Sequence, residues 1–187
     1  RSNNKDWFAI ALDDVWTIAM KSFIHAQKLY PIKLHAFVLM NNHYHMLLST
    51  PDSNIDQFMQ AFNKYFSEKL KIRSGRINKM FGGPYKWSIV DNEVYLYNVH
   101  RYIYQNPLRA EMVTSCEDFP FSSLTHQVQN KEFPIPLHQA IDFSHHQMLD
   151  WYNTKLEDKQ VDGLRRGLKH AHCKVNPERD SKLTPSY

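Results

Sequence analysis

Hydrophobic residues are spaced along the first half of the chain in a pattern that predicts a β-hairpin between two helices. Residues 32–49 place apolar, β-branched and aromatic side chains on both sides of the polar pair Asn41-Asn42, which is typical of two strands joined by a turn. Apolar residues recur at helical spacing over residues 13–29 and again over residues 55–75. We therefore expect the order helix, strand, strand, helix.

The second half of the chain is predicted to be mostly helical. Residues 76–90 contain short apolar runs around a Gly-Gly-Pro sequence, which predicts either a second hairpin or an irregular loop. Helical spacing resumes over residues 93–106 and stops before Pro107, because the residue that precedes a proline avoids the α region. Two more helical patterns cover residues 144–154 and 159–171, and the last dozen residues are polar enough to be disordered.

A His-Tyr-His triplet, His43 to His45, lies in the predicted second strand. Side chains alternate between the two faces of a strand, and residues two apart are roughly 6.6 Å apart at the backbone. Both imidazoles can therefore reach one ion while Tyr44 turns to the opposite face. The chain has 11 histidines, so such a pair also arises by chance, and His170 and His172 form a second one in a basic segment. A metal site needs a further ligand elsewhere.

Tyr102 and Asn106 are candidates to complete that site from the predicted helix. They are four residues apart, so they are neighbours on the helix surface. If this surface meets the histidines, Asn106 adds an oxygen ligand and leaves positions open for a substrate. Nitrogen and oxygen ligands together favour Mn²⁺ or Mg²⁺, with the nitrogens tilting the preference toward manganese. The simpler alternative is that Tyr102, one of ten tyrosines, packs the helix against the sheet.

The chemistry that suits these four residues is attack of a phenol on a phosphodiester. A free phenol has a pKa of about 10 and is a poor nucleophile at neutral pH, so it needs a cation that polarises the phosphate. The product would be a covalent tyrosyl phosphate, which conserves the bond energy and allows rejoining without ATP. The chain has five glycines and no phosphate-binding or dinucleotide-binding motif, which argues against a nucleotide cofactor.

Composition narrows the class of protein further. A chain of 187 residues, 42% of them hydrophobic, can bury one core, so we expect one domain with an appendage. Cys116 and Cys173 belong to no metal-binding cysteine motif, and reduced thiols in the cytoplasm are expected. The sequence shows no signal peptide and no run of apolar residues that would span a membrane. A net charge of +4 permits an acidic partner such as nucleic acid.

Three separated segments of the sequence resemble the REP-associated tyrosine transposases, relatives of the single-tyrosine HUH transposases of insertion sequences. The segments are HAFVLMNNHYHMLL, MFGGPYKWSIV and RYIYQNPLRAEMV, and the resemblance covers roughly residues 1–125. It implies that His43 and His45 are metal ligands, that Tyr102 is the nucleophile and that Asn106 completes the metal site. It also implies an α+β fold, with an antiparallel sheet flanked by helices in a ferredoxin-like arrangement, and a 5′-phosphotyrosine intermediate on single-stranded DNA beside a hairpin.

Basic residues supply the expected DNA contacts. Cations and aromatic rings interleave between positions 76 and 87, which suits single-stranded nucleic acid because rings stack on unpaired bases. An edge strand with buried aromatic residues explains that stretch equally well. The basic run GLRRGLKHAHCK would either clamp hairpin DNA, as the resemblance implies, or form a solvated helix end. The predicted contacts are Arg76, Lys79, Tyr85, Lys86, Arg101, Arg109, Arg165, Arg166 and Lys169.

The sequence departs from the family pattern at three positions outside the proposed site. Ser2 and Glu111 stand where glycine is usual, which changes backbone freedom, and Pro84 stands where many members carry an arginine that can contact phosphate. Residues 1–4 look like the end of an early strand and its R-G-N motif. We therefore expect the first strand of the sheet to precede this numbering.

These observations predict an HUH transposase domain over residues 1–125 and a helical, basic C-terminal extension over residues 126–187. The predicted function is a metal-dependent single-stranded DNA endonuclease and strand transferase that acts at hairpins in DNA transposition. We expect a monomer, with a dimer as the alternative, in the cytoplasm and associated with the nucleoid. Three other functions stay open: a domesticated protein that binds hairpins of DNA or RNA without cutting them, a replication initiator or relaxase, and a metal hydrolase that uses activated water.

Overall fold

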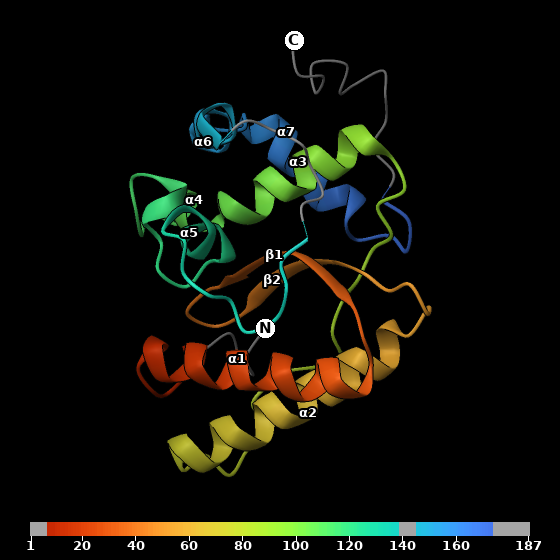
Figure 1. Ribbon diagram of the computed structural model, residues 1–187, viewed down its shortest axis with the longest axis vertical. Coiled ribbons are helices and arrows are strands. Elements are labelled where there is room, and N and C mark those ends of the chain that lie inside the picture. Colours follow the sequence, from red (N-terminus) through yellow and green to blue (C-terminus); the bar gives the residue numbers. More distant parts are fainter. Residues whose placement is uncertain (1–6, 139–144, 174–187) are drawn as a thin grey trace.

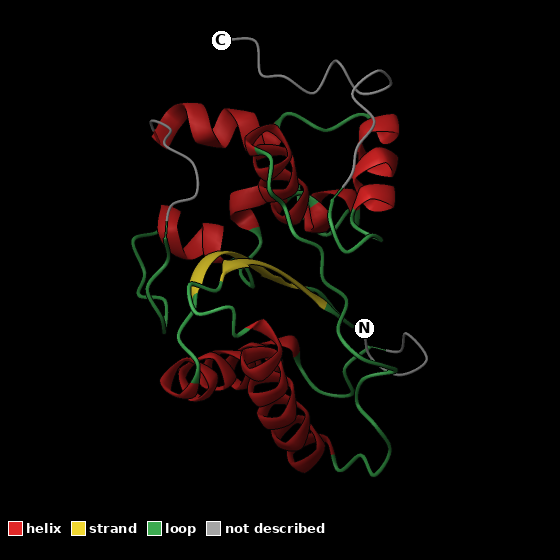
Figure 2. Cartoon of the chain, turned by 90° about the vertical axis from the view of Figure 1, so that its right-hand side faces the viewer, coloured by secondary structure: helices red, strands yellow, loops and turns green. Residues whose placement is uncertain are grey.

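An antiparallel hairpin lies between two helical layers (Figures 1 and 2). The computed structural model describes residues 7–138 and 145–173. In chain order its elements are α1 (Leu12–Leu29), β1 (Lys33–Leu39), β2 (Tyr44–Ser49), α2 (Ile55–Ser74), α3 (Glu93–Tyr104), α4 (Asn106–Arg109), η2 (Cys116–Asp118), α5 (Ser123–Val128), α6 (His145–Asn153) and α7 (Asp158–Gly167). The predicted α+β class, with an antiparallel sheet flanked by helices, is confirmed, and the sheet has two strands within the described ranges.

A β-bulge decides which side chains of β1 face each layer. β1 and β2 pair along their full lengths, but the register shifts between Leu34 and Ala36. Leu34 and Phe37 therefore face the same core although they are three residues apart, whereas Ala36 and Val38 face the other core. One hairpin thus contributes to two separate cores.

The first core lies between the hairpin and the α1–α2 layer. Buried phenylalanines dominate it, and the ring of Phe23 on α1 lies 4.7 Å from that of Phe62 on α2, measured between centroids. The helices predicted over residues 13–29 and 55–75 are confirmed to within one residue at each end. Gly75 ends α2 with a φ of 67°, the left-handed conformation that glycine adopts without strain.

The second core joins the opposite face of the hairpin to the helices α3, α5, α6 and α7. Its fully buried members include Leu124, Val161 and Leu164, which come from α5 and α7. Both predicted C-terminal helices are present as α6 and α7, although α7 ends four residues earlier than expected. The predicted helix over residues 93–106 is divided: α3 ends at Tyr104, Gln105 forms a turn, and Asn106 begins the short helix α4.

Between α2 and α3 the chain forms an irregular loop rather than a second hairpin. An isolated bridge pairs Ile89 of this loop with His172 after α7. The backbone nitrogen of Ile89 donates to the backbone oxygen of Ala171, and the backbone nitrogen of Cys173 donates to the backbone oxygen of Ile89. Cys116 and Cys173 are both buried and form no disulfide. The described helices include none that is long and apolar enough to cross a membrane.

Three expectations from the sequence fall outside the described residues. They are the early strand at residues 1–4, the substitution at Ser2, and the disordered tail at residues 176–187. They stay predictions.

Candidate active site

The two histidines of the His-Tyr-His triplet converge on the face of the hairpin toward α3. The Nε2 atoms of His43 and His45 are 3.1 Å apart, and the ring centroids are 4.8 Å apart in a T-shaped arrangement. Two ligands at right angles about one ion, each about 2.1 Å from it, would have nearly this separation. The pair is thus spaced either for a hydrogen bond or for holding one cation.

Asn42 orients the first of these rings. Nδ1 of His43 donates a hydrogen bond of 2.6 Å to the side-chain oxygen of Asn42. An amide oxygen only accepts hydrogen bonds, so the proton lies on Nδ1 and the lone pair of Nε2 is directed toward His45. A metal-binding histidine commonly has such a partner on its second nitrogen. In the sequence, Asn42 looked like a turn residue alone.

Tyr44 anchors the triplet from the opposite face. Its ring packs against Phe62 of α2, 5.5 Å between centroids, and its hydroxyl donates a hydrogen bond of 2.6 Å to Asn63. Burial raises the pKa of the Tyr44 phenol above its ordinary value. Tyr44 therefore attaches one face of β2 to α2, while both histidines on the other face point toward α3.

Tyr102 lies beside the histidines. Its ring makes an edge contact with His45, 6.0 Å between centroids, and only 7% of its surface is exposed. Tyr104 lies instead in the core, where its hydroxyl is hydrogen-bonded to Ser123 and burial raises the pKa of the Tyr104 phenol. Of these two tyrosines, Tyr102 is the one positioned at the histidine pair.

Asn106 follows Tyr102 by one helical turn and begins α4. Its side-chain nitrogen donates hydrogen bonds to the backbone oxygens of Tyr102, at 2.8 Å, and Ile103, at 3.3 Å. These bonds occupy the amide nitrogen. The side chain is half-buried, and an amide oxygen is a ligand type that suits a hard divalent cation.

A metal site at the histidine pair needs at least one more ligand besides His43 and His45. Within residues 7–138 and 145–173, no group of three or more His, Cys, Asp or Glu side chains is placed to hold a metal. A cation at His43 and His45 would therefore need a ligand of another type, and Asn106 is the amide on the adjacent helix. The donor set of two imidazoles and one amide fits Mn²⁺ or Mg²⁺.

Two of the predicted DNA contacts hold the C-terminal helices in place. Arg101 stacks on Trp151, 5.2 Å from guanidinium carbon to ring centroid, and donates to the backbone oxygen of Thr154. Arg109 donates to the backbone oxygen of Leu156 and forms an ion pair of 2.6 Å with Asp158. Both guanidinium groups therefore have internal partners.

The other predicted contacts lie in three places. Arg76, Lys79, Tyr85 and Lys86 are on the irregular loop, where the hydroxyl of Tyr85 donates to Asp56 of α2. Arg165, Arg166 and Lys169 are exposed in and after α7, and an interaction with Tyr102 raises the pKa of Arg165. Nothing in the sequence signalled that interaction, because Arg165 and Tyr102 are 63 positions apart.

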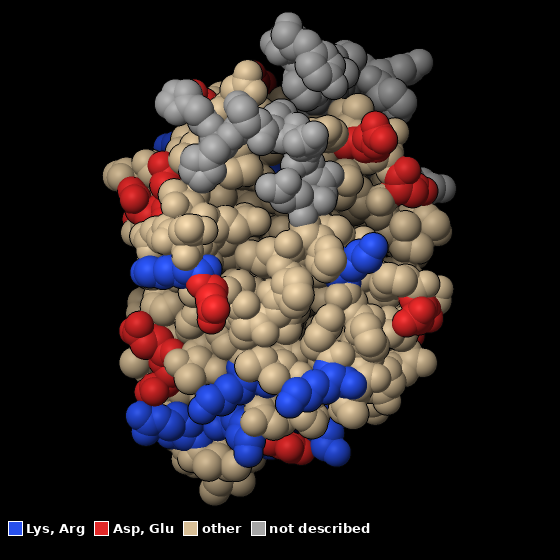
Figure 3. Space-filling model, in the orientation of Figure 1, with Lys and Arg blue, Asp and Glu red and all other residues tan. Residues whose placement is uncertain are grey.

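A further group of cations lies on the α1–α2 layer, away from the histidines. Figure 3 shows Lys and Arg side chains gathered over these helices. The exposed members are Lys21, Lys28, Lys64, Lys69 and Arg73. Arg73 is paired with Asp14 at 3.0 Å, so part of this charge is neutralised.

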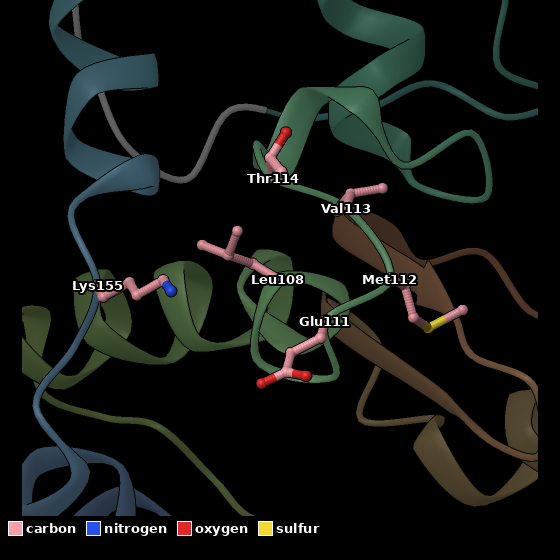
Figure 4. A pocket seen from close by; sticks show the side chains of 6 residues that line it. All are labelled: Leu108, Glu111, Met112, Val113, Thr114 and Lys155. Atoms are coloured by element: carbon pink, nitrogen blue, oxygen red, sulfur yellow. The ribbon is translucent and has the colours of Figure 1, made fainter.

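A shallow hollow beside α4 contains none of the four predicted site residues. It is lined by Leu108, Glu111, Met112, Val113, Thr114 and Lys155 (Figure 4). The hollow is thus separate from the histidine site.

The fold and the four side chains define an α+β protein with a paired-histidine site beside a helical tyrosine. A family model described as "Transposase IS200 like" matches residues 10–106, just over half of the chain, and includes all four residues. The chain belongs to this family of IS200-like transposases.

Comparisons with solved structures and with curated proteins add no further evidence for the family. One solved structure, described as a REP-associated tyrosine transposase bound to a REP hairpin, is similar over 69% of this chain and 77% of its own, with 21% identity and a TM-score of 0.49. The comparison with curated proteins gave no match.

Proposed function

We propose that this protein is a metal-dependent single-stranded DNA endonuclease and strand transferase that uses Tyr102 as its nucleophile. One observation carries the proposal: the Nε2 atoms of His43 and His45 converge, 3.1 Å apart, beside the ring of Tyr102, in a chain of the IS200-like transposase family. The substrate we propose is single-stranded DNA next to a hairpin, and this rests on the sequence resemblance to the REP-associated group.

In the proposed reaction the oxygen of Tyr102 attacks the phosphorus of a phosphodiester. The phenolic O–H bond breaks and its proton passes to solvent, an O–P bond forms, and the bond from phosphorus to the 3′ oxygen breaks. The 3′ oxygen takes up a proton and leaves as a hydroxyl. Attack by a 3′ hydroxyl on the tyrosyl phosphate reverses these changes and joins a strand, so no nucleotide cofactor is consumed.

His43, His45 and Asn106 would hold a divalent cation, Mn²⁺ or Mg²⁺. When bound, such an ion supplies charge that polarises the phosphate. Asn42 keeps His43 in the tautomer whose Nε2 carries a lone pair, and the hydrogen bond from Tyr44 to Asn63 anchors the opposite face of the strand. The packing of Tyr102 on His45 restricts its ring, which shortens the search for an in-line geometry.

The test is formation of a protein–DNA adduct that survives denaturation. The protein is incubated with Mn²⁺ and single-stranded oligonucleotides that contain hairpins. We expect the wild type to form the adduct and Tyr102→Phe to form none, because the phenylalanine lacks the attacking oxygen. Tyr95→Phe removes a hydroxyl from the same helix and serves as the matched control, with the adduct retained.

Two outcomes would contradict the proposal. A wild type that binds hairpins but forms no adduct on any of them would instead be a domesticated binding protein. An adduct that persists in Tyr102→Phe would mean that another residue is the nucleophile. Removal of the cation, or His43→Ala, should abolish cleavage and leave most DNA affinity, since phosphate contacts dominate binding. The predicted monomeric state and cytoplasmic location stay predictions.

A further inference from the structure

The irregular loop between α2 and α3 is attached to the rest of the molecule at three points. It runs from α2 past one end of the hairpin to α3 (Figures 1 and 2). Phe81 packs against the first core, and the hydroxyl of Tyr85 donates a hydrogen bond to Asp56 of α2. The backbone of Ile89 forms two hydrogen bonds of 2.8 Å with the segment after α7. These contacts hold residues 86–88 between two fixed points.

The attachments turn two aromatic residues of the loop inward and leave a third in solvent. Phe81 and Tyr85 are half-buried, whereas 46% of the surface of Trp87 is exposed. Within the described ranges, Trp87 forms no hydrogen bond and no contact with another ring. The alternative that this stretch buries its aromatic residues therefore applies to Phe81 and Tyr85 but not to Trp87. Trp87 is an apolar ring that is held in place and open to a partner.

Exposed cations lie beside Trp87 in the chain and on the segment to which the loop is bound. Lys86 immediately precedes the tryptophan, and Lys169 lies in the segment after α7; both are exposed. The carboxylate of Asp91 offsets part of this charge and is 3.6 Å from Nδ1 of His172. The cations and the ring together suit a partner that has both phosphate groups and flat apolar faces.

We propose that Trp87 stacks on an unpaired base of the single-stranded DNA that flanks the hairpin, while Lys86 and Lys169 contact neighbouring phosphates. The assignment rests on the proposed function and adds a DNA-binding residue to it. Every base has a π face, and stacking on an aromatic side chain needs a face that no neighbouring base covers, as in a single strand. A cationic surface with an exposed ring is the combination that binds single strands with little sequence preference.

The position of the loop indicates which part of the DNA this ring meets. Cys173, which is hydrogen-bonded to Ile89, packs against Val94 in the first turn of α3. Tyr102 lies eight residues further along this helix, which corresponds to about 12 Å. The loop thus meets α3 at the end opposite to the proposed nucleophile. The stacked base therefore belongs to the flank and not to the nucleotide whose phosphate is attacked.

The experiment measures DNA binding without a divalent cation, so that no strand is cleaved. The full chain is titrated into labelled hairpin oligonucleotides with single-stranded flanks, and fluorescence anisotropy gives the dissociation constant. We expect Trp87→Ala to raise this constant about tenfold, which corresponds to about 1.4 kcal/mol. Trp87→Phe should raise it less, because phenylalanine keeps a ring. On a hairpin without flanks both variants should bind like the wild type, which also shows that they are folded.

Further controls separate stacking from other contacts. Ile77→Ala shortens an apolar side chain of the same loop that is 94% exposed and has no ring, so it should keep the wild-type affinity. Abasic sites placed in turn along the flank should reveal one position at which the wild type loses affinity, and there Trp87→Ala should lose no more. Lys86→Ala should reduce the slope of log affinity against log salt concentration by about 1.

The outcomes distinguish this assignment from the proposed function. If Trp87→Ala binds flanked hairpins as tightly as the wild type, the assignment is overturned, and the proposed function stands when the wild type forms its adduct with Mn²⁺. Equal losses with and without flanks also overturn it and make the ring a contact of the stem. An equal loss in Ile77→Ala, with a mass that rises with protein concentration, overturns it in favour of an interface between two copies. A wild type that forms no adduct, but whose affinity for the flank depends on Trp87, supports stacking and overturns only the proposed chemistry.

Discussion

Glu111 has a backbone conformation that most residues avoid. Its φ is 55°, in the left-handed region, and it follows α4 in the turn beside the hollow of Figure 4. Left-handed backbone costs a residue with a Cβ roughly 1–2 kcal/mol, and glycine adopts it without that cost. Related sequences were expected to carry glycine here, and the structure supplies the physical reason.

We predict that Glu111→Gly stabilises the protein by about 0.5–1 kcal/mol, since the relief of strain exceeds the added freedom of the unfolded chain. Urea unfolding measures the change. Asn130→Gly is the matched control, because Asn130 has a φ of 54° but asparagine tolerates this region well. Equal effects at both positions, or a loss of stability at Glu111, would contradict the explanation.

Single residues of the site differ in how far the sequence could predict them. The alternation of a strand is enough to place His43 and His45 on one face and Tyr44 on the other, and the structure has this arrangement. The hydrogen bond from His43 to Asn42 depends on the local turn, which periodicity does not describe. The interaction of Tyr102 that raises the pKa of Arg165 depends on how α7 packs against α3, which no local pattern encodes.

At the scale of the elements, hydrogen bonds to the segment between α6 and α7 hold the junction between α3 and α4 in place. Gln105 is fully buried between the two helices. Its side-chain nitrogen donates 2.7 Å hydrogen bonds to the backbone oxygens of Tyr152 and Thr154, and its oxygen accepts from the backbone nitrogen of Leu156 at 3.1 Å. One side chain therefore joins the helix of Tyr102 to the segment that connects α6 and α7.

We predict that Gln105→Leu destabilises the protein by roughly 3 kcal/mol, because it leaves buried backbone groups without partners. Urea unfolding tests the change, and Gln60→Leu on the exposed face of α2 is the control, with an effect of less than about 0.5 kcal/mol. A loss of less than about 1 kcal/mol for Gln105→Leu would show that water replaces these hydrogen bonds.

Helices were more predictable from the sequence than the sheet and its surroundings. The stripe from Phe58 to Leu70 repeats at helical spacing for about three turns, so α2 could be placed closely. The loop from α2 to α3 has no such repeat, and its contact with His172 is long-range. Tyr102 and Asn106 were expected as neighbours on the helix surface, and Tyr102 is buried there because the hairpin and the C-terminal helices cover α3.

For the whole molecule, the second core contains a buried histidine that couples folding to pH. His100 is 5% exposed, and its Nδ1 accepts a 2.7 Å hydrogen bond from the hydroxyl of Tyr152. Burial lowers the pKa of His100 to about 4. In the unfolded chain the imidazole takes up a proton below about pH 6.5, whereas in the folded protein it stays neutral down to about pH 4.

We therefore predict that the free energy of unfolding is highest above about pH 6.5 and falls as the pH drops toward 4, by at most roughly 3 kcal/mol from this group. Urea unfolding at pH 7 and pH 4.5 measures the difference. His100→Phe should reduce the pH dependence, while His170→Phe, which removes an exposed histidine, should leave it unchanged. Equal pH dependence in His100→Phe and the wild type would assign the effect to other groups.

The length of the turn between β1 and β2 determines which face of the hairpin each side chain of β2 lies on. It is closed by a 2.8 Å hydrogen bond from the backbone nitrogen of Met40 to the backbone oxygen of His43, immediately before the paired residues of β2. One added residue here would move every side chain of β2 to the opposite face of the sheet. Tyr44 would then enter the polar site, and both imidazoles would enter a core of phenylalanines. Insertions or deletions of one residue in this turn should therefore be as damaging to the chemistry as loss of the ligands themselves.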